Sequence, residues 1–444
     1  MVQPLITRAV AEADFVSIDY ELTGLHEKTE RYIGVPQAYE AHCQAVQRFI
    51  PVQLGICAGK YDTSSGSWSL TPASIYLYPS SGSSVDESSP CFSVSTAALN
   101  FLVSNGFDCN EWVSQGLGWL RPGEEADRRK TIQTRIDEVN TLINTKASPV
   151  ENEGSSNPLS LPEGPDKDSL LAVKAQVDEW LGSTAEQQPA LEIPMESAFL
   201  RLLAHTFISN EFPTLFSLSV RRGDARLLCV YRDQKDLYRE QLKSLEKEME
   251  KLDREIGARG VFDTISKEKI PLIGHNCFFD LLHTYQTFYD SVPPHVDQFK
   301  QKWLQRFPRT FDTKYLAESN EVLGGLQPPA TLKGLCDFMA KSSKVDVKIS
   351  PISPEFDYAL PSTESSDLSH DAGYDAMMTS LVFLQQLQHI LERKSLSFSQ
   401  LDLRSLNLKP GTQKITIHDL LRSGVNRVRL VKTQPPSMNL RERE

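Results

Sequence analysis

Two carboxylates spaced two residues apart stand at the end of a short apolar segment near the N-terminus. Residues 15–24 read FVSIDYELTG, and an apolar run of this length is typical of a buried strand. Strand side chains alternate between faces, so Asp19 and Glu21 point the same way and Tyr20 points to the opposite face. Like charges this close repel unless a cation lies between them, and oxygen ligands at this spacing suit Mg²⁺ or Mn²⁺. A strand that merely ends in a polar loop explains this segment alone equally well.

Two further acidic segments lie far along the chain. Residues 270–283 read as a second buried strand, a glycine turn and the start of an amphipathic helix with Asp280 in its early turns. Near the end, a polar loop delivers His370 just ahead of a helix that carries Asp375. Each segment alone is explained by a helix cap or a solvated acid. Together, Asp-x-Glu, an Asp after a strand and His-x4-Asp match the spacing of a nuclease site in which four carboxylates hold two metal ions.

The chain resembles the deadenylase branch of the DEDD 3′→5′ exonucleases, in particular the poly(A)-specific ribonucleases and their small-RNA-trimming relatives. Besides residues 15–24, the resemblance covers nearly the whole chain through residues 53–57, 102–108, 274–284, 307–314 and 370–375. It implies an α/β fold with a ribonuclease H-like DEDD exonuclease core, in which helices flank a mixed sheet. It also implies a small inserted α/β domain of the Arg-xxx-His type that binds single-stranded nucleic acid.

The resemblance implies a role for each acidic residue of the predicted site. Asp19, Glu21, Asp280 and Asp375 become the catalytic ligands of two Mg²⁺ ions, which Mn²⁺ can replace, with Asp19 bridging both. Two such ions, roughly 3.5–4 Å apart, stabilise the attacking and leaving oxygens of a phosphodiester. His370 is expected to take a proton from the attacking water, because the ordinary pKa of histidine is near neutral. His275, His283 and Asp312 belong to the family pattern as well and are interpreted as structural or supporting residues.

The residues after the first acidic pair are expected to contact the RNA end: Leu22, Thr23, Gly24 and Leu25. Close relatives carry Phe where this chain has Leu22, so aromatic stacking, worth roughly 1–3 kcal/mol per base, is lost there. Tyr20 replaces a small residue of the relatives and is expected to be harmless on an outward face.

The predicted inserted domain carries an Arg-xxx-His motif. Arg201 and His205 lie one helical turn apart on a shared face, and Arg222 belongs to a nearby basic group with Arg221 and Arg226. These side chains are expected to bind single-stranded RNA. The spacing is common by chance, and an ion pair of Arg201 with a neighbouring acid and a core position for His205 is the alternative. The location between two nuclease halves favours RNA binding.

The order of segments predicts a nuclease domain interrupted by an insertion. The expected parts are the first nuclease half 1–146, a linker 147–168, the inserted domain 169–235, a charged helix 236–258, the second nuclease half 259–395 and a C-terminal extension 396–444 without an RNA-recognition motif. The charged helix has an apolar seam of less than three heptads. This seam indicates packing within the chain or, alternatively, a dimer contact.

Length and composition restrict the class of protein. The 444 residues exceed one ordinary domain, and 40% hydrophobic residues suffice for sizeable cores. Seven cysteines without a CxxC pair indicate reduced thiols in the nucleus and/or cytoplasm, and the N-terminus lacks the order of a secretory signal. No segment approaches the roughly 20 apolar residues of a membrane span, so a soluble, non-secreted protein is expected. The net charge of −11 requires that any nucleic-acid contact be local.

The sequence therefore predicts a metal-dependent 3′→5′ exoribonuclease that releases nucleoside 5′-monophosphates from single-stranded RNA 3′ ends. The substrate is a poly(A) tail or the 3′ extension of a small-RNA precursor, and the resemblance further implies a homodimer. Two alternatives remain open, namely a catalytically inactive RNA-binding homologue and a DNA 3′→5′ exonuclease that shares the metal site.

Overall fold

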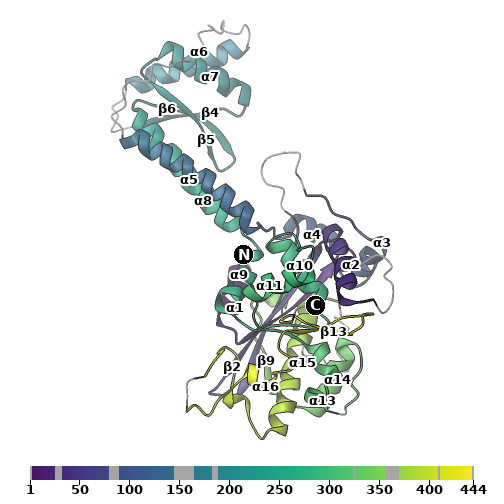
Figure 1. Cartoon of the computed structure of the whole chain (residues 1–444). Coiled ribbons are helices and arrows are strands. Elements are labelled where there is room, and N and C mark those ends of the chain that lie inside the picture. Colours follow the sequence, from purple (N-terminus) through teal and green to yellow (C-terminus); the bar gives the residue numbers. More distant parts are fainter. Residues whose placement is uncertain are drawn as a thin grey trace. The chain divides into compact units, whose positions relative to one another are not determined.

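The chain folds into two compact units (Figure 1), and the structure is a computed structural model. It describes residues 3–25, 33–79, 90–144, 165–182, 189–324, 326–356, 358, 360, 370–408 and 411–442. Unit 1 comprises Met1–Glu125 and Glu255–Glu444, and unit 2 comprises Ala126–Arg254. Most of the predicted linker 147–168 lies outside the described residues, but its last four residues begin a helix.

A six-stranded mixed sheet forms the centre of unit 1. Its strands are β1 (Phe15–Leu22), β2 (Pro51–Asp62), β3 (Ser67–Tyr76), β7 (Leu272–Gly274), β8 (Thr310–Asp312) and β9 (Val347–Ile349). Their order is β8-β7-β1-β2-β3-β9. The β1–β2 and β2–β3 pairs are antiparallel, whereas β1–β7, β7–β8 and β3–β9 are parallel. Because β1 and β7 run the same way, the segments that follow them leave the sheet at the same edge.

Helices cover the sheet of unit 1 and connect its strands. They are α1 (Gln3–Glu12), α2 (Val35–Arg48), α3 (Thr96–Ser104), α4 (Cys109–Gln115), α9 (Arg259–Glu268), α10 (Phe278–Phe288), α11 (Val296–Arg306), α12 (Thr313–Glu318), α13 (Asn320–Leu323), α14 (Leu332–Ser342) and α15 (Ala372–Arg393). Short 3₁₀ turns, η1 and η2, span Pro354–Phe356 and Phe398–Gln400. The expected α/β fold, with a mixed sheet flanked by helices, is confirmed.

Side chains of β1 alternate between two cores. Phe15 packs in a core with α15, and the hydroxyl of Ser17 donates to the carbonyl of Ala376 on that helix (2.6 Å). Val16 and Ile18 point the other way, into a core shared with α9, α10 and α11. This is the period-two alternation that the sequence predicts for a buried strand. The acidic pair of β1 therefore shares the face on which α15 packs.

The segment after α15 belongs to the core of unit 1. It contains β10 (Leu401–Asp402), β11 (Ile415–Thr416), α16 (Ile417–Leu420), β12 (Arg427–Arg429) and β13 (Ser437–Asn439). The strands β10 and β11 pair in parallel, and β12 and β13 form an antiparallel pair. Side chains of this segment are buried in both hydrophobic cores of unit 1. The segment predicted as an extension is thus integrated with the α/β fold of unit 1.

Unit 2 is built around a small antiparallel sheet in the order β4-β6-β5. Its elements are α5 (Pro122–Asn144), α6 (Pro165–Leu181), β4 (Ala190–Pro194), α7 (Ala198–Glu211), β5 (Phe216–Arg222), β6 (Ala225–Tyr231) and α8 (Gln234–Glu255). Helices α6 and α7 share one hydrophobic core with the sheet, whereas the start of α8 packs on its other face.

The long helices α5 and α8 lie side by side (Figure 1). Arg129 of α5 pairs with Asp253 of α8 at 2.6 Å, and Arg135 pairs with Glu248 at 3.3 Å. Buried apolar residues line both helices, including Ile132 and Val139 of α5 and Leu245 and Leu252 of α8. The apolar seam of α8 is therefore used within the chain, and these two helices make unit 2 larger than the predicted segment 169–235. Among the helices of the described residues, none is both long and apolar enough to cross a membrane.

Candidate active site

The acidic pair of β1 lies opposite two residues of β2 that shape the site. Asp19 pairs with Gly55 and Glu21 pairs with Gln53, and side chains at directly opposed positions share a face. A Cβ at Gly55 would lie 1.7 Å from the carbonyl oxygen of Ala372, at the start of α15. Only a glycine permits this close approach, which brings the first turn of α15 to the strand that carries Asp19.

The first turn of α15 delivers a histidine and a carboxylate. His370 lies in the turn before the helix with φ 75°, and its backbone N–H donates to Oδ2 of Asp375 (3.3 Å). Asp371 caps the helix, because its Oδ1 accepts a hydrogen bond from the backbone N–H of Tyr374 (3.0 Å). Possible ligand atoms of Glu21, His370 and Asp375 all lie within 4.8 Å of one another. The structure thus places Glu21, from the first acidic segment of the sequence, beside His370 and Asp375, from the last.

Asp280 reaches the site from the turn after β7. The turn requires a left-handed residue, Asn276 with φ 55°, before α10 begins at Phe278. The backbone N–H groups of Asn276 and Cys277 both donate to the carboxylate of Asp312, at 2.8 and 3.3 Å. This anchor fixes the start of α10 and places Asp280 in its first turn, as the sequence predicts.

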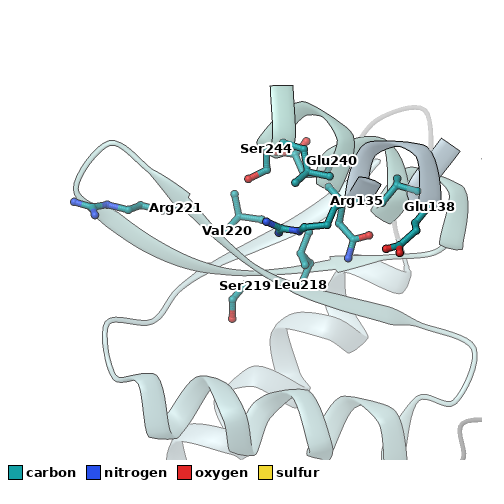
Figure 2. A pocket seen from close by; sticks show the side chains of 11 residues that line it. Arg135, Glu138, Leu218, Ser219, Val220, Arg221, Glu240 and Ser244 are labelled. Atoms are coloured by element: carbon teal, nitrogen blue, oxygen red, sulfur yellow. The ribbon is translucent and has the colours of Figure 1, made fainter. Parts of the chain in front are cut away.

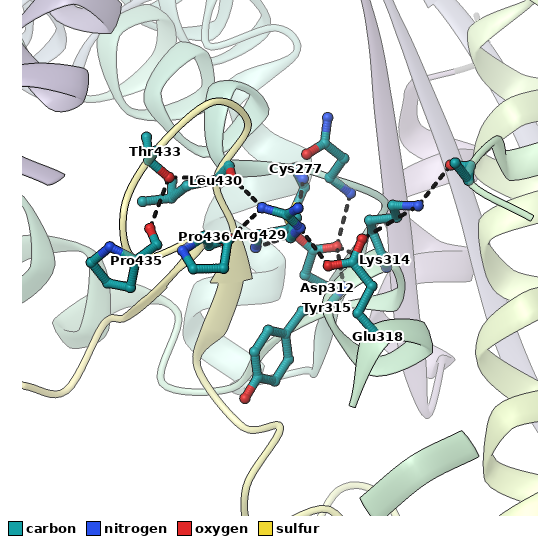
Figure 3. Close-up of polar contacts among 12 residues, drawn as sticks. Cys277, Asp312, Lys314, Tyr315, Glu318, Arg429, Leu430, Thr433, Pro435 and Pro436 are labelled. Carbon is teal, nitrogen blue, oxygen red and sulfur yellow. Dashed lines mark hydrogen bonds and ion pairs between the residues drawn. The ribbon is translucent and has the colours of Figure 1, made fainter. Parts of the chain in front are cut away.

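Asp312 is a structural acid at the centre of a backbone network (Figure 3). Besides the turn after β7, its carboxylate accepts hydrogen bonds from the backbone N–H groups of Lys314 (2.9 Å), Tyr315 (3.4 Å) and Arg429 (2.9 Å). The side chain of Arg429 in turn pairs with Glu318. Burial raises the pKa of Asp312, and the backbone donors act against that rise. Its predicted supporting role agrees with these contacts.

The carboxylates of the site repel one another. Burial raises the pKa of Asp19 well above its usual range, and the nearby Asp375, Asp280 and Glu21 carboxylates add to the rise. Burial also raises the pKa of Glu21 to about 8 and that of Asp280 well above normal, with Asp312 as the charged neighbour of Asp280. The main causes of these three rises are burial and neighbouring carboxylates, with no cationic side chain among them. Hard carboxylate oxygens in this number fit a divalent cation such as Mg²⁺.

Two histidines of the predicted pattern lie in buried surroundings. His275 forms a 2.9 Å hydrogen bond between Nδ1 and the hydroxyl of Thr313, and burial lowers its pKa to about 4. His283 packs edge-to-face on Phe279, with ring centroids 4.6 Å apart. Its ring nitrogens have no hydrogen-bond partner among the described residues, and burial lowers its pKa to about 3. Both rings are therefore neutral near pH 7, which suits structural roles.

The four residues predicted to contact the RNA end differ in exposure. Leu22 is 6% exposed and belongs to the core, and Thr23 is buried with its hydroxyl bound to the backbone just before β2. A Cβ at Gly24 would lie 2.6 Å from the ring of Phe49, so the chain passes tightly over that ring. Leu25 alone has an accessible side chain, with 58% exposed.

An aromatic residue that the sequence patterns do not single out lies against His370. The ring of Phe101, on α3, meets the imidazole edge-to-face with centroids 4.6 Å apart and remains 45% exposed. The backbone N–H of Ser95, which caps α3, donates to the carbonyl of Thr23 (2.8 Å), so this helix is tied to the end of β1. Phe101 directly precedes the motif segment 102–108, but no spacing rule connects it with a residue so far along the chain.

Tyr20 has a different environment from the one predicted. Its side chain points away from the carboxylates, as expected, but it is only 6% exposed, so the expected outward face is wrong. Its hydroxyl lies 3.0 Å from that of Thr284, which donates to the carbonyl oxygen of Asp280 (2.8 Å). The sheet of unit 1 is covered on both faces, so the side opposite the carboxylates is also a core. Tyr20 therefore links β1 to the helix that carries Asp280.

The two residues of the Arg-xxx-His motif are engaged within unit 2. Arg201 is 8% exposed, and its guanidinium donates to the backbone carbonyls of Met195 and Glu196. His205 bridges the hydroxyls of Ser217 and Ser219 on β5, at 2.7 and 2.9 Å. Burial, together with the charge of Arg201, lowers the pKa of His205. Both side chains hold α7 against its neighbours in unit 2.

The basic residues of the β5–β6 hairpin are more accessible. Arg222 pairs with Glu192 (2.7 Å) and Glu240 (3.4 Å), and its side chain remains half exposed. Arg221 and Arg226 are also exposed. The hairpin tip therefore gathers three arginines on one accessible turn.

Fold and site define an α/β protein with a carboxylate–histidine cluster at the edge of a mixed sheet. Residues 2–383 match the CAF1 family ribonuclease model, and the chain belongs to this family.

Among curated proteins, the chain is similar to poly(A)-specific ribonuclease PARN of Xenopus laevis, with 25% identity over 426 residues, 93% of this chain and 65% of that protein. It is 24% identical to poly(A)-specific ribonuclease PNLDC1 of Mus musculus, over 88% of this chain and 70% of that protein. Identity to the pre-piRNA 3′-exonuclease trimmer of Bombyx mori is 22%, over 86% and 68%. The resemblance found in the sequence is thereby confirmed.

The chain spans about 65% of the length of the first curated relatives it matches. Among solved structures, S. pombe Pop2p in its Mg²⁺- and Mn²⁺-bound form aligns with 12% identity and a TM-score of 0.35, over 91% of this chain and 92% of that one.

Proposed function

We propose that this protein is a metal-dependent 3′→5′ exoribonuclease that releases nucleoside 5′-monophosphates from single-stranded RNA 3′ ends. The observation that carries the proposal is the convergence of acidic residues from β1, α10 and α15 beside His370. Family membership and the similarity to poly(A)-specific ribonucleases and a pre-piRNA trimmer support RNA as the substrate. Poly(A) tails and 3′ extensions of small-RNA precursors are the two substrate classes.

Four residues of the chain would hold two Mg²⁺ ions, for which Mn²⁺ can substitute: Asp19, Glu21, Asp280 and Asp375. The raised pKa values of Asp19, Glu21 and Asp280 support this assignment, because nearby positive charge relieves their repulsion. When bound, such ions stabilise the attacking and leaving oxygens of a phosphodiester. A buried cluster of this kind also disfavours the inactive-homologue alternative, because pure binding gives no physical reason to keep mutually repelling acids.

His370 is the proposed general base. Its imidazole is exposed at the end of the acidic cluster, whereas its backbone is fixed through the hydrogen bond to Asp375. An exposed imidazole on a fixed turn can accept a proton from water and return it to solvent. Phe101 supports one side of this ring and so restricts its orientation.

Unit 2 is proposed to hold the RNA upstream of its 3′ end, chiefly through the β5–β6 hairpin. A cavity of ≈ 350 Å³ opens between β5 and the helices α5 and α8, but charges of both signs line it, from Arg135 and Arg221 to Glu138 and Glu240 (Figure 2). Mixed charge inside a cavity does not favour a polyanion, so we place the phosphate contacts on the exposed side of the hairpin tip, where RNA phosphates would replace the acidic partners of Arg221 and Arg222. Arg201 and His205 are assigned to supporting this surface. Homodimerisation is proposed from the resemblance alone.

The experiment that tests the proposed activity compares a 5′-labelled single-stranded RNA with its DNA counterpart in Mg²⁺. We expect a 3′→5′ ladder and 5′-monophosphate products from the RNA, and neither from an Asp19→Ala variant. A variant that still degrades RNA at the wild-type rate would contradict the metal-site assignment. Equal degradation of the DNA would favour the DNA exonuclease, and an intact RNA with retained binding would favour the inactive homologue.

A further inference from the structure

A fifth carboxylate lies beside the four proposed metal ligands, and its oxygens are already occupied. Oδ1 of Asp371 accepts a hydrogen bond from the hydroxyl of Tyr358 (2.6 Å) as well as from the backbone N–H of Tyr374 (3.0 Å). Oδ2 accepts from Nε2 of Gln53 (3.3 Å). An acid whose oxygens are committed to three donors of the chain is better suited to fixing geometry than to holding an ion.

Each of the donors comes from a different part of unit 1. Gln53 lies on β2 opposite Glu21, and its Oε1 also accepts from the backbone N–H of Ala372 (3.4 Å). Tyr358 lies in the segment between η1 and α15. A Cβ at Gly373 would lie 2.7 Å from the Tyr358 hydroxyl, so this hydroxyl lies directly against the helix backbone. Gln53 on β2 and the side chain of Tyr358 thus contact the first turn of α15 from two sides.

These contacts restrain the residue that precedes Asp371, namely His370. It adjoins Asp371 and has φ 75°, a conformation that a non-glycine side chain disfavours and that persists only where the surroundings impose it. Asp371 is held on one side of His370, and the backbone N–H of His370 itself donates to Asp375, so the backbone of His370 is restrained by both contacts.

We propose that Tyr358, Asp371 and Gln53 form a clamp that positions His370 over the acidic cluster. Asp371 is then a positioning residue and not a metal ligand. The kinetic test of this inference rests on the proposed exoribonuclease function. A second test reads the hydrogen bonds of the clamp directly and does not need that function.

The kinetic test uses a Tyr358→Phe variant, which removes one hydroxyl. The matched control is Tyr39→Phe, which removes an equally short buried hydrogen bond, from Tyr39 to the carbonyl of Pro293 (2.6 Å), elsewhere in unit 1. We expect Tyr358→Phe to lower kcat about tenfold with KM within twofold, and the control to keep the wild-type kcat.

A double-mutant cycle identifies the group through which the clamp acts. In a His370→Ala background, adding Tyr358→Phe should lower kcat by less than twofold, because the group that the clamp positions is already missing. If the two losses multiply, or if KM rises instead of kcat falling, Tyr358 does not act through His370 and the inference is overturned.

The second test needs no activity. Hydrogen exchange of a peptide covering residues 370–376 reads the amides of Ala372 and Tyr374, which donate to the clamp. Tyr358→Phe, and Asp371→Asn, which retains a helix cap, should speed exchange there, whereas Tyr39→Phe should not. Unchanged exchange in both clamp variants would overturn the inference. Faster exchange in the clamp variants of a protein whose wild type fails to cut RNA would uphold the clamp and remove only the proposed function.

Discussion

In metal-free buffer, Glu21→Gln is expected to stabilise unit 1 while abolishing hydrolysis. Glutamine keeps the size of the side chain and cannot ionise. In the folded state the pKa of Glu21 is raised to about 8 from an ordinary value of 4.5, mainly by burial and then by Asp375, Asp371 and Asp280. The folded state therefore binds more protons than the unfolded chain between these two pH values. The free energy of unfolding must fall as the pH rises through this window.

The size of the effect follows from the two pKa values. A tenfold change in an equilibrium constant corresponds to about 1.4 kcal/mol. At pH 7 the folded state keeps Glu21 mostly protonated whereas the unfolded chain releases the proton, and this difference destabilises the folded state by about 3 kcal/mol. At pH 5 the same arithmetic leaves about 1 kcal/mol or less. The figure at pH 7 is an upper limit, because neighbouring carboxylates share the protons of the cluster.

The assay is urea unfolding in EDTA at pH 5, 7 and 8, with Glu40→Gln, exposed on α2, as the control. The gain in unfolding free energy from Glu21→Gln should grow with pH, and the control should show no such trend. Mg²⁺ should then stabilise the wild type more than the variant, because a ligand of the folded state raises its stability. A gain that is independent of pH would refute the electrostatic reasoning.

Three further predictions concern His370, Gly55 and the arginines of the β5–β6 hairpin. His370→Ala should lower kcat by a factor of roughly 10²–10⁴ with RNA affinity unchanged, measured by single-turnover kinetics and filter binding. Gly55→Ala should abolish activity and lower the melting temperature, because the added Cβ would displace Ala372 at the start of α15; Gly123→Ala, which meets no atom within 4 Å, is the control. Changing Arg222 and Arg226 together to Glu should flatten the salt dependence of binding to long RNAs, by about 0.7 for each phosphate that is no longer neutralised, and leave very short RNAs unaffected.

The sequence predicts much of the site because local periodicity determines much of it. The alternation of β1, the turn before Asp280 and the helix start at Asp371 depend on neighbouring residues and follow from spacing alone. The intramolecular packing of α8 was also open to prediction, because both α5 and α8 carry an apolar stripe. Neither stripe alone predicts that α5 and α8 pack against each other.

Contacts between distant residues escape such rules. Phe101 meets His370 across more than 200 residues of chain, and Tyr20 reaches Thr284 on α10. The buried state of Arg201 is a further example, because a motif spacing reports a shared helix face but not whether that face is covered. In each case the deciding partner lies on an element whose position depends on the tertiary fold.

The hairpin β12–β13 shows why a site residue can depend on a segment that carries no chemistry. The backbone N–H of Arg429 donates to Asp312, and Asp312 holds the turn that starts α10 and places Asp280. Asn426 strengthens the same link, because its side chain binds the backbone of Thr310 on β8 from within a fully buried position. A buried carboxylate left without such donors is costly, so loss of the hairpin contact would loosen the turn as well as the strand. The last part of the chain therefore acts on the acidic cluster through backbone geometry.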